Sequence, residues 1–386
     1  MDSSSVLSSL LVCSLLYYAL VQFGLVLGIL RLKKTDAAAQ PFVSVVVAAR
    51  NEERTIEPLL ASLLDQSYPH YEIIIVDDRS TDSTSAVVAA HQKSDSRLKL
   101  VTVASNSSDL PPKKNALTKG IRSSCGEILL FTDADCIPSK NWIAALVSQF
   151  DDTVGVVAGY SPYDANLIVS GRSGKPLQNF LHRFVRGEEF KGAIWSAGSI
   201  GLNRAWLCTG RNLAYRRRVF DEVGGFEKIK MSISGDDDLF IQIVRHTTKW
   251  KIRYAVKPDS FVRTAPPVTF SEFVQQRTRH FSAGKFFSTP MKAFFFFFHL
   301  SNLILLLGLT TMILSTQLYQ LALLGFAIKL ACDLLVNWAA IRVILNMEIR
   351  KGFNFSDFLL TEILYILYNT FIGPLGFVKT FRWKPE

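Results

Sequence analysis

Hydrophobic residues gather at the two ends of the 386-residue chain, and the middle has the mixed pattern of a water-soluble domain. Val6 to Leu30 is an apolar stretch of 25 residues, long enough to cross a bilayer as a helix. It lacks a basic leading region and is longer than the core of a signal peptide, so an uncleaved membrane anchor is expected. Further stretches of this kind lie at 293–315, 318–345 and 358–378.

Basic residues beside these stretches indicate the orientation. Arg31, Lys33 and Lys34 follow the first stretch, and the positive-inside rule then places the next domain in the cytoplasm of a multi-pass membrane protein. The turn after the second stretch has no basic residue, and Arg342, Arg350 and Lys351 follow the third. The last stretch does not follow the positive-inside rule, because a full crossing would put Lys379, Arg382 and Lys384 on the outer side of the membrane. A break at Gly373-Pro374 instead predicts a re-entrant or interfacial hairpin.

The middle of the chain alternates between strand and helix patterns. Strands are predicted at 42–49, 71–76, 98–103 and 128–131, with helices over 56–64 and about 114–123. This order predicts an α/β domain with a mostly parallel sheet. The stretch 160–195 shows less regular patterning and scattered charges, and we expect it to form part of an acceptor side.

Polar clusters follow the predicted strands at the sheet edge where ligands bind. They are Arg50-Asn51-Glu52, Asp77-Asp78 and Asp133-Ala134-Asp135. Asp133 and Asp135 point to the same side of an extended chain, and two carboxylates there suit Mg²⁺ or Mn²⁺. The alternative is a polar turn that caps the next helix. Three clusters at one edge favour a ligand site.

Charge and cysteine content narrow the function classes. The formal net charge of +10 would suit nucleic acid, but no basic-aromatic motif accompanies it. We therefore expect no nucleic-acid partner, and anionic lipid and diphosphates explain the charge. The five cysteines form no CxxC pair, which argues against a zinc site and a disulfide framework.

Seven motifs in order over residues 42–280 resemble the family 2 glycosyltransferases, which are inverting enzymes with a GT-A fold. The motifs are VSVVVAARNEE, IIIVDDRSTDST, KKNALTKG, FTDADC, GRNLAYRRRVF, SGDDDLFI and QQRTRH. Membrane-attached members include the cellulose and hyaluronan synthase relatives. The resemblance implies a nucleoside-diphosphate-sugar donor, with uridine the base by family habit, and a divalent metal.

The resemblance also implies roles for individual residues. Arg50 and Glu52 would line the base and ribose, Asp78 would contact the base with Asp77 close by, and Lys114 would meet the donor. A helix cap is the alternative for Asp78, and a solvated helix lysine for Lys114. Asp133 and Asp135 would hold the metal, with one of them also near the ribose.

The acceptor hydroxyl must lose a proton as it attacks, so a carboxylate base is required. In Gly235-Asp236-Asp237-Asp238 the family motif selects Asp237 as the base with Asp236 its neighbour, whereas a shift of one residue selects Asp236. Asp238 is equally explained as an acidic start of a helix.

Gln276, Arg279 and His280 resemble the family motif Gln-x-x-Arg-Trp, in which Arg helps bind the diphosphate and Trp stacks on the acceptor sugar. His280 replaces the Trp and offers a smaller platform, so non-processive transfer is expected. The alternative is a basic interfacial helix before the membrane, and both can hold.

The expected organisation is an anchor helix at 1–34, a cytoplasmic GT-A domain at 35–265, an interfacial amphipathic segment at 266–292 and membrane helices at 293–386. Lys329 and Asp333 share a helix face in the third apolar stretch, and Glu362 could join them. We interpret this group as a structural pairing, with lipid-substrate binding as the alternative.

These features predict a membrane-anchored hexosyltransferase that transfers a sugar to a hydroxyl of a membrane lipid or lipid-linked glycan. A processive polysaccharide synthase would need more spans and the missing Trp. An inactive membrane scaffold that retains the fold is opposed by the intact acidic motifs. The hypothesis of a transporter has less support, because no inverted repeat is visible in the sequence.

Overall fold

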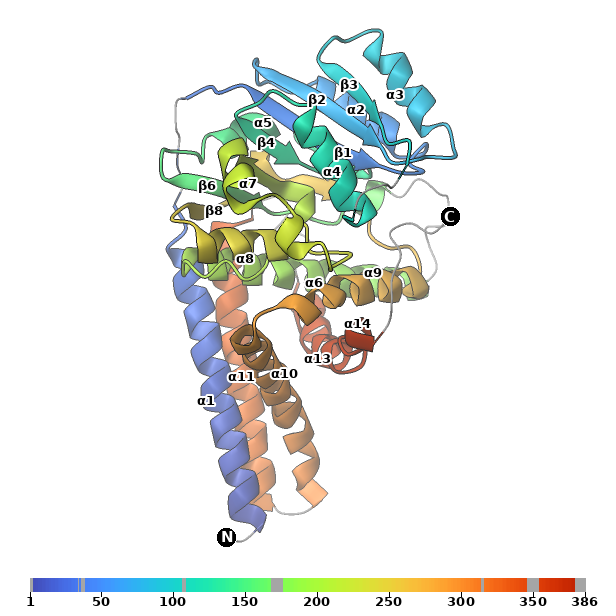
Figure 1. Cartoon of the computed structure of the whole chain (residues 1–386). Helices are drawn as coiled ribbons and strands as arrows, with labels where there is room; N and C mark the ends of the chain where they lie inside the picture. The colour runs from blue at the N-terminus through green and yellow to red at the C-terminus, as the bar shows by residue number, and fades with distance from the viewer. Residues whose placement is uncertain are drawn as a thin grey trace.

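A computed structural model gives the structure of residues 3–33, 35, 39–105, 109–167, 176–313, 316–345 and 354–378. In these residues an α/β domain stands on a bundle of long apolar helices (Figure 1). Several basic residues used above to predict the orientation lie outside the described residues: Lys34, Arg350, Lys351, Lys379, Arg382 and Lys384.

The described part of the α/β domain contains a seven-stranded sheet of order β3-β2-β1-β4-β7-β6-β8. Strands β1 to β4 are mutually parallel, as predicted, whereas β7 runs antiparallel to β4 and β6. Both faces of β1 and β2 are buried, which explains their continuous apolar sequence. The bounds are β1 Val43–Ala49, β2 Tyr71–Asp77, β3 Leu98–Thr102, β4 Ile128–Phe131, β6 Val154–Gly159, β7 Leu213–Arg216 and β8 Lys251–Ala255.

Helices cover the two faces of this sheet. Alternate residues of β1 enter different cores, with Val45 packed beside α2 and Val46 beside α4. A short antiparallel pair, β5 Cys136–Pro138 and β9 Val262–Thr264, lies beside the main sheet. The helices are α2 Ile56–Leu64, α3 Thr84–Gln92, α4 Pro112–Arg122, α5 Trp142–Val147, α7 Arg217–Val223 and α8 Asp238–Thr247.

Helix α6 (Pro176–Gly201) lies across the base of the domain between the sheet and the bundle (Figure 1). Its contacts with α1 (Ser3–Leu30) are backbone to backbone. A Cβ atom added to Gly28 would lie 2.0 Å from the Gly198 carbonyl oxygen, and one added to Gly201 would lie 1.9 Å from that of Gly28. Only glycine permits this approach. The sequence did not predict α6, because its side chains face several different neighbours and leave no single apolar stripe.

Within the described parts of the chain, four helical segments are long and apolar enough to cross a membrane: Ser4–Leu30, Thr289–Thr311, Thr316–Val343 and Phe355–Val378. The first three correspond to α1, α10 (Thr289–Gly308) and α11 (Thr316–Val343), which form the bundle in Figure 1. The multi-pass prediction agrees with these spans.

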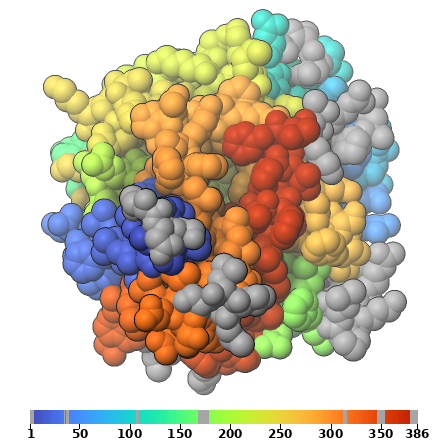
Figure 2. Space-filling view, turned by 90° about the horizontal axis from the view of Figure 1, so that it is seen from below, coloured from blue at the N-terminus to red at the C-terminus, as the bar shows by residue number. Residues whose placement is uncertain are grey.

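The fourth apolar stretch is arranged differently from the other three. Helix α13 (Phe355–Phe371) lies beneath α6 at the base of the domain, and Figure 2 shows it beside the bundle helices. The chain then turns before α14 (Leu375–Val378), at the predicted Gly373-Pro374 break. Whether this segment crosses the membrane or lies at its surface stays a prediction. Helix α9 (Phe270–Ser282) lies at the level of α6, above α13 in Figure 1, and begins with a capping box of Thr269 and Glu272.

A buried charged network joins the bundle to α6. Lys329 Nζ lies 2.6 Å from Asp333 Oδ2 and 3.0 Å from Glu362 Oε2, and Lys191 Nζ of α6 lies 2.7 Å from Glu362 Oε1. Gln22 Nε2 of α1 donates to Asp333 Oδ1 at 2.7 Å. Two ammonium groups thus meet two carboxylates, which agrees with the structural interpretation of the Lys329–Asp333 pair.

Candidate active site

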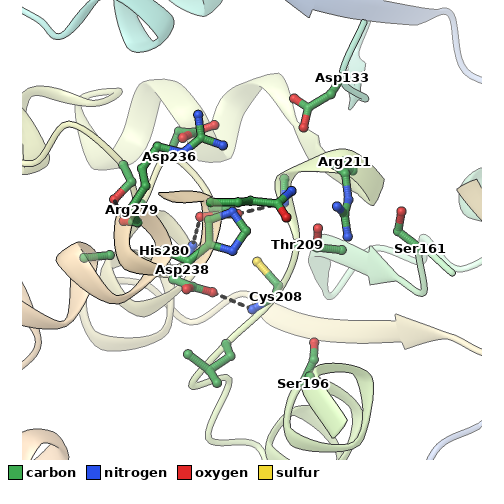
Figure 3. A pocket seen from close by; sticks show the side chains of 18 of the residues that line it. Asp133, Ser161, Ser196, Cys208, Thr209, Arg211, Asp236, Asp238, Arg279 and His280 are labelled. Carbon is green, nitrogen blue, oxygen red and sulfur yellow. Dashed lines mark hydrogen bonds between the residues drawn. The ribbon is translucent and has the colours of Figure 1, made fainter. Parts of the chain in front are cut away.

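A cavity of about 300 Å³ opens beside the carboxyl ends of β1 and β4. Its walls come from the ends of these strands, from α6, from the segments 207–211 and 233–238, and from α9. Figure 3 shows Asp133, Arg211, Asp236 and His280 around this space. The cavity therefore collects side chains from segments far apart in the sequence. The predicted site residues among its lining are Glu52, Asp133, Asp135, Asp236, Asp237, Gln276, Arg279 and His280.

Lys113 connects the two acidic motifs of the cavity. Its Nζ lies 3.1 Å from Asp133 Oδ1 and 3.1 Å from Asp236 Oδ2. Burial acts to lower the pKa of Lys113, but Asp133 and Asp236 outweigh it and raise that pKa, so the ammonium keeps its charge. Burial likewise acts to raise the pKa of Asp133, but the charges of Lys113 and Arg211 hold it below its usual value.

Asp133 and Asp135 lie together at the cavity, as their spacing predicted. Among the described residues, no group of three or more His, Cys, Asp or Glu side chains forms a ready-made metal site. Mg²⁺ is commonly held by one or two carboxylates together with substrate phosphates. Two cavity-lining carboxylates, one of them exposed, fit that kind of incomplete site.

The three consecutive aspartates have different surroundings. Asp237 begins α8, where its Oδ1 accepts from Asp238 N at 2.7 Å and its Oδ2 from Gly210 N at 2.8 Å. Asp238 Oδ1 accepts from Cys208 N at 2.7 Å. These two carboxylates hold the segment 208–210 against the helix, whereas Asp236 faces Lys113. Burial and the charge of Asp236 raise the pKa of Asp237.

Lys114, which was expected to meet the donor, lies away from the cavity. It is completely buried and donates to the carbonyl oxygens of Ser232 and, at 2.8 Å, Ser234. Burial lowers its pKa to about 8. Lys114 thus fixes the segment that leads to Gly235, whose φ of +81° favours glycine at the turn before Asp236. Its neighbour Lys113 enters the cavity instead, because adjacent helical residues point about 100° apart.

The expected base-binding residues form a separate cluster at the ends of β1 and β2. Asp78 is completely buried, with Arg79 Nε 2.9 Å from its Oδ1 and Arg50 Nη1 4.0 Å from its Oδ2. Asp77 Oδ1 accepts from Ser80 N at 3.2 Å. Arg50, Asp77 and Asp78 are absent from the cavity lining, and Glu52 connects their cluster to it.

Helix α9 contributes a second ionic cluster. Arg277 pairs with Glu188 of α6 and lies 3.5 Å from Glu189, and its Nη1 lies 3.3 Å from His280 Nδ1. Arg211 Nη2 lies 2.8 Å from Glu189 Oε1. Burial raises the pKa of Glu188 to about 7, although the Arg277 charge acts in the opposite direction.

Lys113, Arg211, Arg277 and the two glutamates were not predicted as site residues. Glu188 and Glu189 belong to the scattered charges of 160–195, which matched no motif. A signal was present for the three basic residues, because Lys113, Arg211 and Arg277 lie within the motifs KKNALTKG, GRNLAYRRRVF and QQRTRH.

Residues 44–224 match the family model described as Glycosyl transferase family 2. The chain is 29% identical over 238 residues to a beta-monoglucosyldiacylglycerol synthase of Nostoc sp., covering 58% of this chain and 46% of that protein. It is 30% identical over 257 residues to a poly-beta-1,6-N-acetyl-D-glucosamine synthase of Staphylococcus epidermidis, covering 66% and 57%. The chain thus spans about half the length of these curated relatives.

A solved mannosyltransferase from Pyrobaculum calidifontis, in complex with GDP-Man and Mn²⁺, has a similar fold. The TM-score is 0.51 at 21% identity, over 94% of this chain and 99% of that one. This likeness confirms the predicted GT-A fold, with its mostly parallel sheet.

Proposed function

We propose that this chain, whose residues 44–224 match the family model of glycosyl transferase family 2, moves a hexose from a nucleoside-diphosphate-sugar to a hydroxyl of a membrane lipid or lipid-linked glycan. The observation that carries the proposal is the convergence of Asp133, Asp135 and Asp236 in one cavity with Lys113 and Arg279. The name of the glucosyldiacylglycerol synthase relative supports a lipid acceptor. The finer likeness to cellulose and hyaluronan synthases stays a prediction.

Breaking the sugar–diphosphate bond leaves negative charge on the diphosphate. A divalent cation held by Asp133 and Asp135 would supply positive charge there. Arg279 of α9 and Lys113 of α4 line the same cavity and would add fixed positive charge around the diphosphate. Uridine is the proposed base, with Glu52 at the cavity and Arg50, Asp77 and Asp78 in the neighbouring cluster at the ends of β1 and β2.

Asp236 is the proposed general base. Both oxygens of Asp237 accept backbone N–H groups, so its carboxylate is committed to the start of α8. Asp236 instead faces the cavity beside the ammonium of Lys113. The Asp236 carboxylate would accept the proton of the acceptor hydroxyl as the hydroxyl oxygen attacks the anomeric carbon.

The acceptor would approach from the membrane. Helices α6 and α9 line the cavity and lie at the base of the domain, directly above the bundle in Figure 1. We propose that the domain lies on the cytoplasmic side, because Arg31 and Lys33 follow α1. His280 at the cavity, in place of a larger aromatic platform, supports transfer of one sugar or very few.

A donor screen tests this function. The full-length chain in membranes is offered individual sugar nucleotides, and the release of nucleoside diphosphate is scored together with a labelled lipid product. We expect one donor to support turnover that a chelator abolishes. Release with none of the donors, in membranes where the folded protein is present, would contradict the proposal.

The metal role has its own test in Asp133→Ala and Asp135→Ala. We expect both variants to lose metal-dependent turnover with little change in thermal unfolding, because side chains at a strand end hold little of the core. Asp65→Ala is the matched control, since Asp65 is an exposed aspartate paired only with Lys140 at 3.1 Å among its described ion pairs. Full turnover of either cavity variant would refute the role.

A further inference from the structure

A second cavity, of about 270 Å³, lies between α6, α11 and α13. Its volume is close to the lower end of the range of small-molecule sites, which is about 300–1,000 Å³. Helix α6 separates it from the cavity of the candidate active site, which we call the catalytic cavity. Glu188, Glu189 and Gly192 of α6 line the catalytic cavity. Arg186, Gly187 and Lys191 of the same helix line the second one. We call it the lateral cavity.

One end of the lateral cavity is polar and rich in cationic groups. Arg183 and Arg186 both reach Asp357 in the first turn of α13, the latter at 2.8 Å, and Lys191 pairs with Glu362. The lining thus holds three cationic side chains and two acidic ones, which leaves one positive charge in excess. The start of the 17-residue helix α13 adds the positive end of its dipole.

Thr361 of α13 packs against α6 beside the lateral cavity. Its side chain is only 4% exposed, and a Cβ atom added to Gly187 would lie 2.1 Å from its Oγ1. This close approach of α13 to α6 bounds the cavity at Gly187.

The other end of the lateral cavity is apolar and faces outward from the bundle. Leu334 and Trp338 of α11 line it and are 42% and 50% exposed. The Arg342 guanidinium lies 4.7 Å from the Trp338 ring centroid. Trp and Arg at the end of an apolar helix mark the level where the helix leaves the hydrocarbon region. The cavity therefore opens sideways at the membrane surface.

We propose that the lateral cavity binds the phosphate headgroup of an anionic glycerophospholipid, with an acyl chain lying along Leu334 and Trp338. The excess positive charge selects an anionic headgroup over a zwitterionic one. The apolar, outward-facing wall selects a lipid over a soluble phosphate. Because α6 separates this lipid from Asp236, it is a bound lipid distinct from the acceptor.

Native mass spectrometry of the delipidated full-length protein tests the site. The protein is titrated with phosphatidylglycerol, with phosphatidylcholine of the same acyl chains, and with glycerol 3-phosphate. We expect one phosphatidylglycerol to bind about tenfold more tightly than phosphatidylcholine, as a charged hydrogen bond contributes. Equal binding of the two lipids, or equally tight binding of glycerol 3-phosphate, would overturn the proposal.

Two variants locate the binding. Arg183→Gln should lower the affinity for phosphatidylglycerol to that for phosphatidylcholine, while Lys140→Gln, which removes one exposed lysine paired with Asp65, should not. Arg186→Gln removes the second arginine beside Asp357 and should likewise weaken the binding of phosphatidylglycerol. Unchanged binding in both cavity variants would exclude the site, whatever the outcome of the donor screen.

Discussion

Charged side chains gather on two faces of α6, and the two groups are organised in opposite ways. In the bundle network, Lys191, Lys329, Asp333 and Glu362 bind one another and leave no excess charge. In the cavity of the candidate active site, Asp237 and Asp238 accept hydrogen bonds from the backbone, whereas Asp236 and Asp133 both pair with Lys113. The bundle network, which we call the closed network because among the described residues its charges pair only with one another, holds helices together. The cavity instead leaves carboxylates available for a substrate, a cation or a proton.

The largest effect is expected from Asp236→Asn. Removal of a general base typically lowers turnover by about 10²–10⁴-fold. Donor binding and thermal unfolding should remain near those of the wild type. Steady-state kinetics of nucleoside diphosphate release would measure the loss.

Asp237→Asn is the matched comparison for that variant. An amide has one acceptor oxygen, so the bond to Gly210 N or to Asp238 N is lost and the unfolding temperature should fall. A severe loss of turnover in this variant, with a mild loss in Asp236→Asn, would identify Asp237 as the base.

Opening the closed network should destabilise the protein. Glu362→Gln leaves Lys191 and Lys329 with a single carboxylate, Asp333, and breaking a buried pair typically costs about 3–5 kcal/mol. Thermal unfolding in detergent measures the change. Glu227→Gln, which removes an exposed pair with Lys230, is the control and should have little effect. An unfolding temperature unchanged by Glu362→Gln would mean that the network holds nothing together.

Glu188 predicts a pH dependence. Its pKa is raised to about 7 by burial, so its neutral form is favoured in the folded state. Its stabilising contribution is therefore complete below the unfolded pKa of about 4.3 and is lost as pH rises through about 7. Glu188→Gln mimics the neutral form, so the variant should gain about 1–3 kcal/mol relative to wild type between pH 4.5 and 7.5. A stability difference that is constant across this range would refute the shift.

The smallest effect is expected from His280→Trp. A larger aromatic platform would stack on the acceptor sugar and contribute on the order of 1 kcal/mol, seen as a lower KM for the acceptor. Product chromatography should still show one added sugar or very few. An unchanged KM would mean that His280 does not face the acceptor. Long products from wild-type protein would favour the processive alternative.

The sequence predicted the parallel strands β1 to β4, because strands buried on both faces have continuous apolar sequences, but it did not predict β5 to β9. It selected Lys114, whereas Lys113 lines the cavity, since both begin the same helix and only the packing of α4 decides which one faces the sheet edge. The choice between Asp236 and Asp237 likewise depends on the segment 208–210, about thirty residues earlier in the chain. Such contacts between distant segments leave no local pattern.

The glycine contact between α1 and α6 fixes the position of the α/β domain along the anchor helix. Because Gly28 touches Gly198 and Gly201 through backbone atoms, the anchor helix cannot slide along α6 to suit a different bilayer. Each residue along α1 corresponds to about 1.5 Å of height, and one turn to about 5.4 Å. The cavity at the carboxyl ends of β1 and β4 is thus held at a set height relative to α1, and under the proposed function this height would decide which acceptor hydroxyls reach Asp236.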